Sequence, residues 1–415
     1  MRKASPTAAP AVLLTGTNRW ASPARIAIEL AKMGCRVQAA SSTGHPLLYT
    51  RSVTQSFPYS SLNPLASLRS AIDASRPDMV IPCDDRAVQH LQELFAQAAT
   101  QNDAAICRLI ENSLGVPKHF ATVSSRFRFL EIASEEGIRV PKTKAIRTED
   151  DLKAWRTEQP FPWILKADES FGGMGVRTAP NWKKALKHLW RMSRPYRTSR
   201  VLKRLFVDLD PHMLRPWWNQ RRPPIIAQSF IAGRPANCAV ACSKGKILAG
   251  IAAEAIATVS PAGPASVVRI VQNAEMMVAA QRIAARLRLS GFFGLDFMVE
   301  EQTSRLYLIE LNPRCTPLCH LHFGKGRDLI AALYAELTGA PVRDIAPVTE
   351  NDLIAYFPAA WKHNRELLTS CYQDVPVDEP DLVQALLRPW PRQTHLFRLG
   401  RAFASAFSAE KSSAI

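Results

Sequence analysis

Residues 294–314 read GLDFMVEEQTSRLYLIELNPR and decide the fold of this chain. Two apolar runs are separated by the polar interval Glu300–Ser304, and this pattern predicts paired strands closing around Gln302-Thr303. Each run carries one acid, Asp296 or Glu310, fourteen positions apart. We therefore expect two carboxylates on neighbouring strands, projecting to the same face of a sheet.

Carboxylates inside apolar strands are costly unless a positive charge neutralises them. The amide of Asn312 lies one side-chain repeat beyond Glu310, so Asp296, Glu310 and Asn312 form an oxygen-rich pocket. Mg²⁺ prefers such ligands and completes its shell with water and nucleotide phosphates. Arg314 would lie close to the metal and hold an anion. The alternative is an edge hairpin whose acids face solvent.

A second motif lies upstream, where residues 163–176 read WILKADESFGGMGV. A predicted strand ends at Lys166 and is followed by a loop containing Gly172, Gly173 and Gly175. Glycines allow backbone amides to approach a phosphate closely, and the lysine adds a mobile positive charge. A glycine loop alone is typical of a tight turn, so the prediction of phosphate binding depends on both motifs together.

The two motifs resemble those of the ATP-grasp superfamily, which includes carbamoyl phosphate synthetase, biotin carboxylase and D-alanine ligase. The resemblance covers roughly residues 112–339. It implies two α+β lobes that sandwich ATP, preceded by a Rossmann-like parallel α/β domain. In that family the strand lysine and glycine loop cover the triphosphate, which corresponds to Lys166, Gly172, Gly173 and Gly175. The metal ligands correspond to Asp296, Glu310 and Asn312, and Arg314 matches the arginine that follows them.

The same resemblance implies two further nucleotide contacts. A cation at the start of the preceding helix corresponds to Arg126, with Arg128 as the alternative. The adenine hinge corresponds to Gln228, Ser229, Phe230 and Ile231. The chain departs from the family at Gln228, where a glutamate is usual, near Pro235, where the ribose-binding acid is replaced, and at Ala167, which stands in place of a proline.

We expect three regions along the chain. Residues 1–111 form the Rossmann-like domain, beginning with the strand Ala11–Gly16 and the helix Ala24–Met33. Its first loop has one glycine where a dinucleotide fingerprint needs three. Asp84 and Asp85 follow a later strand, and we expect them to meet the substrate or the ATP-binding lobe because ligands collect at the carboxyl ends of parallel strands.

Residues 112–345 form the ATP-grasp domain, with a lid lobe at about 140–228 and a metal-binding lobe at about 229–345. Residues 346–415 form a C-terminal extension. Its segment 395–407 has an apolar face interrupted by two arginines, and two interpretations stay open: docking on the body, or resting on a membrane surface.

The segment 188–224, within the lid lobe, is strongly basic. It contains only two acids and contributes to the formal net charge of +17. Its Lys and Arg residues are Arg191, Arg194, Arg197, Arg200, Lys203, Arg204, Arg215, Arg221 and Arg222. One interpretation is a basic amphipathic face for anionic lipid, nucleic acid or an acidic substrate. The other is a solvated insertion that lengthens the lid. No nucleic-acid motif supports direct base reading.

The composition agrees with a multi-lobed globular protein. The chain has 415 residues, 47% of them hydrophobic. Its eight cysteines contain no C-x-x-C pair; Cys315 and Cys319, with His320 and His322, are the zinc candidate, but the spacing favours buried thiols. Residues 1–10 lack an apolar core, and no uninterrupted apolar run of about 18 residues occurs, so we expect a cytoplasmic protein with at most peripheral membrane contact.

These features favour an ATP- and Mg²⁺-dependent ligase, with Mn²⁺ as the alternative ion. A small carboxylate would attack ATP, and the acyl phosphate would be captured by an amine, releasing ADP and phosphate. We assign catalytic roles to Lys166, Arg314 and Arg269, the last to orient the carboxylate. Homo-oligomerisation is left open. Two alternatives remain: an ATP-dependent carboxylase or phosphotransferase, and a nucleotide-binding regulatory or scaffold protein.

Overall fold

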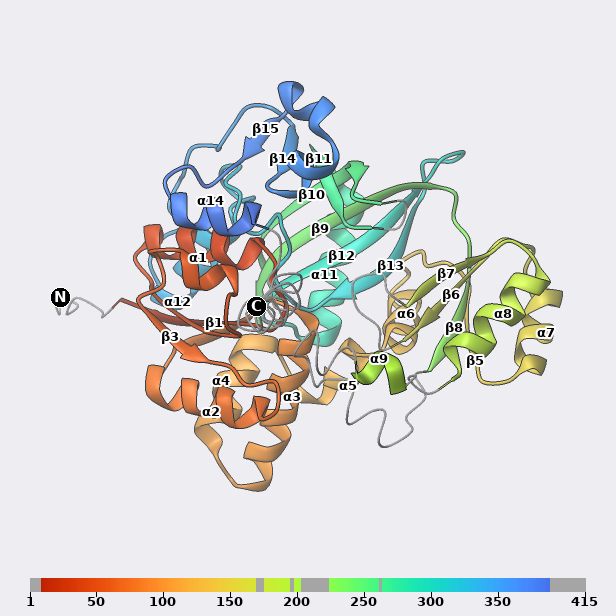
Figure 1. Ribbon diagram of the computed structural model, residues 1–415, viewed down its shortest axis with the longest axis horizontal. Coiled ribbons are helices and arrows are strands. Elements are labelled where there is room, and N and C mark those ends of the chain that lie inside the picture. Colours follow the sequence, from red (N-terminus) through yellow and green to blue (C-terminus); the bar gives the residue numbers. More distant parts are fainter. Residues whose placement is uncertain (1–8, 169–174, 195–197, 203–223, 261–262, 389–415) are drawn as a thin grey trace, which may run out of the picture.

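The computed structural model describes residues 9–168, 175–194, 198–202, 224–260 and 263–388. They build three sheets: a four-stranded parallel sheet near the N-terminus, a four-stranded antiparallel sheet in the lid lobe and a seven-stranded central sheet. The lid lobe projects to one side of the molecule (Figure 1). Within the described ranges, no helix combines the length and apolar composition needed to cross a bilayer. The apolar segment 395–407 and most of the basic segment 188–224 lie outside the described residues.

The N-terminal sheet has the strand order β3-β2-β1-β4, with every neighbouring pair parallel. Its elements are β1 (Ala11–Gly16), α1 (Ser22–Met33), β2 (Arg36–Ser41), η1 (Pro46–Tyr49), β3 (Gln55–Pro58), α2 (Pro64–Ser75), β4 (Met79–Pro82), α3 (Asp85–Thr100) and α4 (Ala104–Leu114). The sequence therefore predicted this parallel α/β unit correctly. The helix α1 begins two residues earlier than expected because Pro23 is well accommodated in a first helical turn.

A helical connection leads into the lid lobe. It comprises η2 (Pro117–His119), α5 (Phe120–Val123) and α6 (Arg126–Glu135). The lid sheet has the order β5-β8-β6-β7, and its elements are β5 (Thr143–Ile146), α7 (Glu149–Glu158), β6 (Trp163–Ala167), β7 (Val176–Ala179), α8 (Trp182–Met192), α9 (Thr198–Leu202) and β8 (Ile225–Ser229). One sheet face buries Trp163 and Leu165 beneath α7 and α8. Because side chains alternate along a strand, Lys166 points from the other face.

The central sheet has the order β13-β12-β9-β10-β11-β14-β15. Its strands and associated helices are β9 (Gly233–Ser243), β10 (Lys246–Thr258), β11 (Ala265–Val271), α11 (Ala274–Leu287), β12 (Gly291–Glu300), β13 (Leu306–Asn312), α12 (Leu329–Thr338), β14 (Leu353–Tyr356), α13 (Ala359–His363), η5 (Arg365–Ser370), β15 (Tyr372–Asp374) and α14 (Pro380–Leu387). The boundary that we expect at residue 345 stays a prediction, and the sheet continues across it through β14 and β15.

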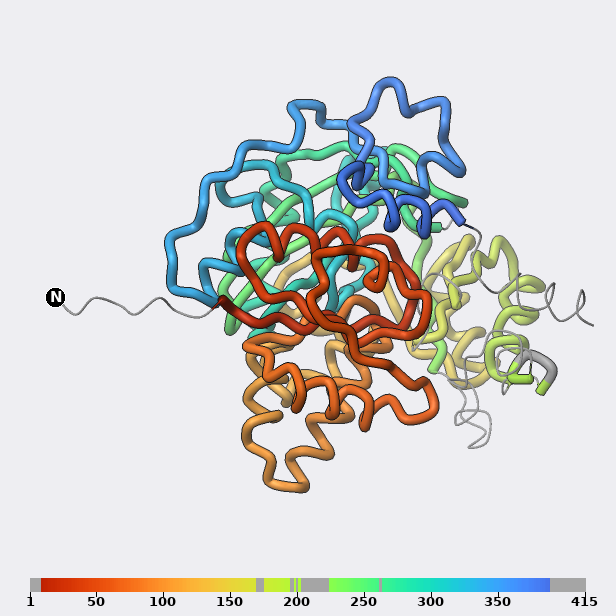
Figure 2. Tube along the Cα trace, turned by 60° about the vertical axis from the view of Figure 1, so that its left-hand side comes forward, coloured from red at the N-terminus to blue at the C-terminus, as the bar shows by residue number. Residues whose placement is uncertain are grey.

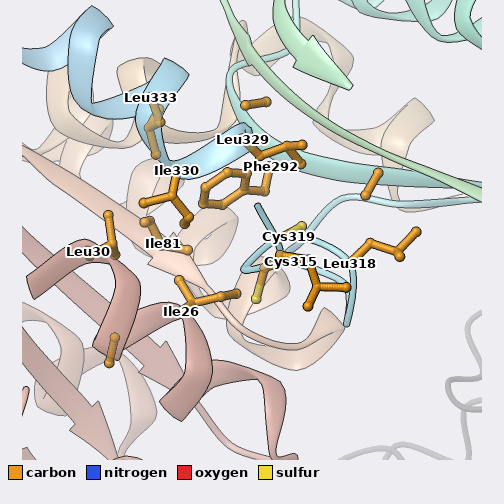
Figure 3. Close-up of a cluster of buried hydrophobic side chains, with 14 of the residues drawn as sticks. Ile26, Leu30, Ile81, Phe292, Cys315, Leu318, Cys319, Leu329, Ile330 and Leu333 are labelled. Carbon is orange, nitrogen blue, oxygen red and sulfur yellow. The ribbon is translucent and has the colours of Figure 1, made fainter. Parts of the chain in front are cut away.

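The two faces of the central sheet pack against different partners. One face, including Leu295 and Phe297, packs with α11 and α6. The other, including Phe292, packs with α12, α1 and the strands of the N-terminal sheet (Figure 3). Asp296 has the same parity along β12 as Phe292, so it lies on the face that meets the N-terminal domain.

Buried ion pairs join α1 to His322, in the segment between β13 and α12, and to Asp374 of β15. The C-terminal part of the chain, drawn in blue, lies beside the red N-terminal part in Figure 2. The ring of His322 contacts Glu29 through Nε2 at 2.8 Å and Asp328 through Nδ1 at 2.6 Å. A second group forms around Asp374, which accepts from Arg25 at 2.5 Å and pairs with His320 at 2.8 Å. These contacts fix residues 320–328 against the N-terminal domain.

The histidine between two carboxylates predicts a pH-dependent stability. Burial alone lowers the pKa of His322, but the hydrogen bonds and charges of Asp328 and Glu29 outweigh it and raise the pKa from 6.5 to about 9. The stabilisation is therefore complete below pH 6.5 and is lost as the pH rises towards 9. Allowing for partial exposure of the ring, we expect a loss of roughly 2 kcal/mol.

Thermal unfolding of the wild type and His322→Gln across this pH range measures the effect. The wild type should lose melting temperature between pH 6.5 and 9 more steeply than the variant. Equal slopes would show that His322 is not held protonated by these carboxylates.

Candidate active site

The hairpin of β12 and β13 places the three predicted metal ligands together. Asp296 lies directly opposite Glu310, and Gly294 lies opposite Asn312. On the other side of β12, Asp296 lies opposite Asn237 of β9. Since directly opposed residues share a sheet face, the structure brings two carboxylates and two amides to one patch.

Asp296 is held by both amides. Asn237 Nδ2 donates to Oδ1 at 2.5 Å, and Asn312 Nδ2 donates to Oδ2 at 2.8 Å. Burial and the nearby charge of Glu310 raise the pKa of Asp296 to about 6, while the two amide hydrogen bonds oppose this rise. Among the described residues Asp296 is thus contacted by two amides and by no cation at ion-pair distance, an environment that suits a hard cation.

Glu310 forms an ion pair with Arg126, whose Nη2 and Nε lie 2.8 and 3.0 Å from Oε2. Burial by itself raises the pKa of Glu310, but the charges of Arg126 and Lys166 outweigh it and leave the pKa below its ordinary value. Arg126 is the first residue of α6, as the sequence predicted for a phosphate-contacting cation, and it also donates to the carbonyl of Ala167 at 3.2 Å. Arg128 is exposed.

Lys166 is buried, with 4% of its surface exposed, on the face of β6 opposite α7 and α8. Burial, with the neighbouring charge of Arg126, lowers the pKa of Lys166 to about 8, although Glu310 and Asp296 raise it. Arg126 bridges Glu310 and the carbonyl of Ala167, the neighbour of Lys166, so groups from three separate segments lie close together. The lid lobe, α6 and the hairpin of β12 and β13 therefore converge on one site.

Arg314 connects this site to the N-terminal domain. Its Nε donates to Asp85 at 3.0 Å, its Nη1 to the carbonyl of Cys315 at 3.2 Å and its Nη2 to Asn312 Oδ1 at 3.0 Å. The ring of Trp20 lies 4.4 Å from its guanidinium carbon. Asp85 thus meets the ATP-binding lobe as we expected from its place after β4.

Asp84 has a different role from Asp85. It caps α3 by accepting from the Ala87 N–H at 2.9 Å, and its Oδ2 accepts from the N–H groups of Thr17 and Asn18 at 2.5 and 2.8 Å. The carboxylate is fully buried and closes the loop after β1. All of these contacts lie within the N-terminal domain, so the Asp84 carboxylate stabilises the fold of that domain.

The structure does not bring Arg269 to the site. Arg269 lies on β11 and forms an exposed ion pair with Asp352 at 3.2 Å. In the register of the central sheet, Arg269 lies opposite Glu254 of β10, and Glu254 lies opposite Ala236 of β9. Ala236 in turn lies opposite Phe297 of β12, so Arg269 and Phe297 share a face. Arg269 therefore belongs to the face opposite Asp296, because adjacent residues of a strand alternate between faces.

The expected nucleotide-binding segments are partly described. In the hinge, Gln228 is buried and donates to Thr143 Oγ1 at 3.2 Å, while the Ser229 N–H donates to the carbonyl of Lys142 at 2.9 Å. Ser229 N–H is thus already used within the fold. Phe230 is 43% exposed, and Ile231 is half-buried. Gly172 and Gly173 lie outside the described residues, whereas the Gly175 carbonyl accepts from the Ala167 N–H at 3.0 Å.

The cysteines do not form a zinc site. All eight are free thiols, and among the described residues no group of three or more His, Cys, Asp or Glu side chains has an arrangement that could hold a metal. Cys315 and Cys319 are buried, and the Cys319 thiol accepts from the Thr316 N–H at 3.2 Å. This confirms the expectation of buried thiols.

Two site residues escaped prediction from the sequence. Asn237 is a neutral residue in an apolar strand, and nothing local marks it as a partner of Asp296. Trp20 lies in a loop almost three hundred residues before Arg314. Strand register could have found Asn237, but only after the order of strands in the central sheet was known.

Comparisons with known proteins agree with this geometry. Residues 123–317 match the family model of the ATP-grasp domain. No curated protein matches the chain. The fold resembles the biotin carboxylase domain dimer of Hydrogenobacter thermophilus 2-oxoglutarate carboxylase, in complex with MgADP, ADP and bicarbonate, with a TM-score of 0.58 and 14% identity over 81% of this chain and 71% of that one.

Two further solved structures have the same fold. One is N5-carboxyaminoimidazole ribonucleotide synthetase from Thermus thermophilus, with a TM-score of 0.56 and 13% identity over 81% of this chain and 80% of that one. The other is L-amino acid ligase from Bacillus licheniformis, with a TM-score of 0.53 and 13% identity over 81% of this chain and 75% of that one. The ATP-grasp fold that the sequence predicts is confirmed.

The Asp85–Arg314 pair predicts strong energetic coupling between the domains. The two side chains are only 13% and 11% exposed, so Asp85→Asn or Arg314→Met leaves a buried group without its partner. We expect each variant to lose roughly 3 kcal/mol of unfolding free energy, and the double variant to lose less than the sum. Urea unfolding of the wild type, the two single variants and the double variant gives the coupling free energy between the two side chains.

The exposed pair of Arg269 and Asp352 serves as the matched control. Arg269→Met should change the free energy of unfolding by no more than about 0.5 kcal/mol. Strictly additive losses at Asp85 and Arg314 would contradict the coupling.

Proposed function

From the ATP-grasp domain at residues 123–317, we propose that this protein is an ATP- and Mg²⁺-dependent ligase that activates a small carboxylate as an acyl phosphate and joins it to an amine. ADP and phosphate would be released. The observation that carries this proposal is the direct opposition of Asp296 and Glu310, with Arg126 paired to Glu310 and the charges of Arg126 and Lys166 lowering the pKa of Glu310. Such a site can bring metal and phosphate charges together without chemistry by a protein nucleophile.

Asp296, Glu310 and Asn312 fit the requirements of a Mg²⁺ site. Two carboxylates on neighbouring strands supply hard oxygen ligands, and Asn312 can add a third. In the present arrangement the Asn312 oxygen accepts from Arg314, so its amide must turn to bind a cation. Mg²⁺ would neutralise the charge that develops on the terminal phosphates. Mn²⁺, which accepts the same oxygen ligands, is the alternative ion.

The nucleotide would lie between the lid lobe and the central sheet. Lys166, Arg126 and the amides of Gly172, Gly173 and Gly175 would hold its phosphates. Arg126 would have to exchange part of its contact with Glu310 for a phosphate oxygen. The base would lie at the hinge of Gln228, Ser229, Phe230 and Ile231, where the groups of Phe230 and Ile231 are the better candidates because the Ser229 N–H already has an acceptor.

Arg314 supports the assignment of the carboxylate site. Of the five N–H groups of its guanidinium, three have acceptors within the described part of the chain, which leaves two for an anion. A carboxylate oxygen would attack the terminal phosphorus, forming an O–P bond while the bond to ADP breaks. An amine would then attack the acyl carbon and displace phosphate. Arg269 stays a sequence prediction without a contact to this site.

A carboxylase is the second candidate. The similar biotin carboxylase domain holds bicarbonate, and bicarbonate could occupy the same position as a small carboxylate in this protein. We keep the cytoplasm as the proposed location, since all eight cysteines are free thiols, as a reducing compartment would leave them. The 2-oxoglutarate carboxylase domain is a dimer in its crystal, whereas self-association of this chain stays a prediction.

Trapping with hydroxylamine tests the proposed chemistry. We expect the purified protein, given Mg-ATP, pooled carboxylates and hydroxylamine, to release ADP and form a hydroxamate, because hydroxylamine captures acyl phosphates. Chromatography separates ADP from AMP, and deconvolution of the pool identifies the acid. AMP would refute the mechanism by indicating adenylation, and ADP formation that requires only bicarbonate would favour the carboxylase.

Glu310→Ala tests the metal assignment. The variant should lose Mg²⁺-dependent ADP formation by at least about a hundredfold, because one of two carboxylate ligands is gone. The variant should stay folded at the assay temperature but with a lowered melting temperature, because Arg126 loses its partner while the repulsion on Asp296 is relieved. The exposed Glu301→Ala is the control and should retain activity. Unchanged ADP formation in Glu310→Ala would contradict the assignment.

A further inference from the structure

The outer face of α8 carries a stripe of cations around an exposed tryptophan. Lys183, Lys187, Trp190 and Arg191 occupy positions i, i+4, i+7 and i+8 and are all exposed, with Trp190 at 60%. This spacing places them on one side of a helix. The opposite side buries Ala185 and Leu189 in the core of the lid lobe, so the stripe faces away from the sheet.

The charge on this face is unbalanced within the protein. In the described part of the chain, no carboxylate lies within ion-pair distance of Lys183, Lys187 or Arg191, and α8 itself contains no acid. Lys184 adds a further cation beside the stripe. Like charges three or four residues apart destabilise a helix, and cations in its first turn oppose the helix dipole.

The neighbouring helix α7 shows the usual arrangement in the same lobe. Its first turn carries Glu149, Asp150 and Asp151, and Lys153 pairs with Asp150 at 2.9 Å. The pKa of His188 on α8 is lowered, chiefly by burial of its ring. The charges of Arg177, Lys184 and Arg191 lower it further. The α8 face is therefore a local excess of positive charge with no counterpart on α7.

We propose that this face, which we define as Lys183, Lys184, Lys187, Trp190 and Arg191, docks the lid lobe onto the surface of an anionic lipid bilayer. The cations complement anionic headgroups, and an indole with an apolar body and a polar N–H is suited to the interface between headgroups and acyl chains. The contact offsets the repulsion within α8 and covers the exposed indole.

The shape of the face favours a membrane over nucleic acid. Single-stranded nucleic acids bind in grooves lined by successive aromatic platforms, whereas α8 presents one tryptophan on a convex helix. Duplex DNA could pair its phosphates with the same cations but would leave the exposed indole of Trp190 without a role, whereas the interface of a bilayer accommodates it. A flat anionic surface can contact the stripe along its length.

Docking by this face is compatible with the proposed enzyme. The helix lies at the outer edge of the lid lobe (Figure 1), and Lys166 projects from the other face of the same sheet. The bilayer would therefore contact the lid from outside and leave the nucleotide side open. Membrane binding does not depend on the proposed reaction, so each can fail independently of the other.

Vesicle binding by the full-length protein tests the proposal. We expect sedimentation with vesicles of phosphatidylcholine and phosphatidylserine at low salt, little binding to phosphatidylcholine alone, and release at high salt. The triple variant Lys183→Glu, Lys187→Glu, Arg191→Glu should weaken binding by at least about a hundredfold, since each cation near such a surface contributes about fivefold. Lys118→Glu, Lys246→Glu, Arg305→Glu has the same net charge and should bind nearly as well as the wild type.

Fluorescence reports on Trp190 directly. Emission of the wild type should shift to shorter wavelength on addition of phosphatidylserine vesicles, and Trp190→Phe should lose this shift while keeping its fold. Absence of wild-type binding, or equal weakening in both triple variants, would overturn the proposal. So would binding of an oligouridylate through the α8 residues without binding to the vesicles, which would assign the face to nucleic acid.

Discussion

The direct opposition of Asp296 and Glu310 on neighbouring strands is the constraint on which the site depends. Two like charges in a sheet that is largely buried repel each other and lose hydration, so the surroundings must compensate. Two amides reach Asp296, whereas Arg126 reaches Glu310. The compensating groups come from β9, from α6 and, through Lys166, from the lid lobe. Because the two carboxylates of this hairpin need compensating groups, β9, α6 and the lid lobe pack around it.

The two aspartates after β4 show how the N-terminal domain takes part. The N–H groups of Thr17 and Asn18 would make an anion cradle at the end of a parallel sheet, but the carboxylate of Asp84 already fills it. On the side of the site that faces the N-terminal domain, the cation available for an anion is therefore Arg314. Its guanidinium donates to Asp85 and lies over the ring of Trp20. One acid closes the domain internally, and the next connects it to the rest of the molecule.

The sequence predicted those parts of the fold and site that depend on local pattern. The strand Ala11–Gly16 and the hairpin of Asp296 and Glu310 follow from short apolar runs bounded by glycine or polar residues. Arg126 was placed by the resemblance to the family, and in the structure Ser125 caps the helix that begins with it. Asn237 and Trp20 depend on strand order and on packing between domains, which no short window contains. Arg269 shows the converse: a conspicuous arginine was assigned to the site, although its register places it on the other face.

The departure from the family at Gln228 has a local physical reason. Its amide donates to Thr143 Oγ1 across the paired strands β5 and β8. The Thr143 hydroxyl itself donates to the Pro141 carbonyl, so a carboxylate at position 228 would meet an oxygen whose proton is already used. The buried charges of the site call for a different explanation. Lys166, Asp296 and Glu310 are costly to bury, and apolar residues of similar volume would often make a more stable protein. A metal ion paired with the carboxylates and a phosphate paired with the lysine would offset that cost.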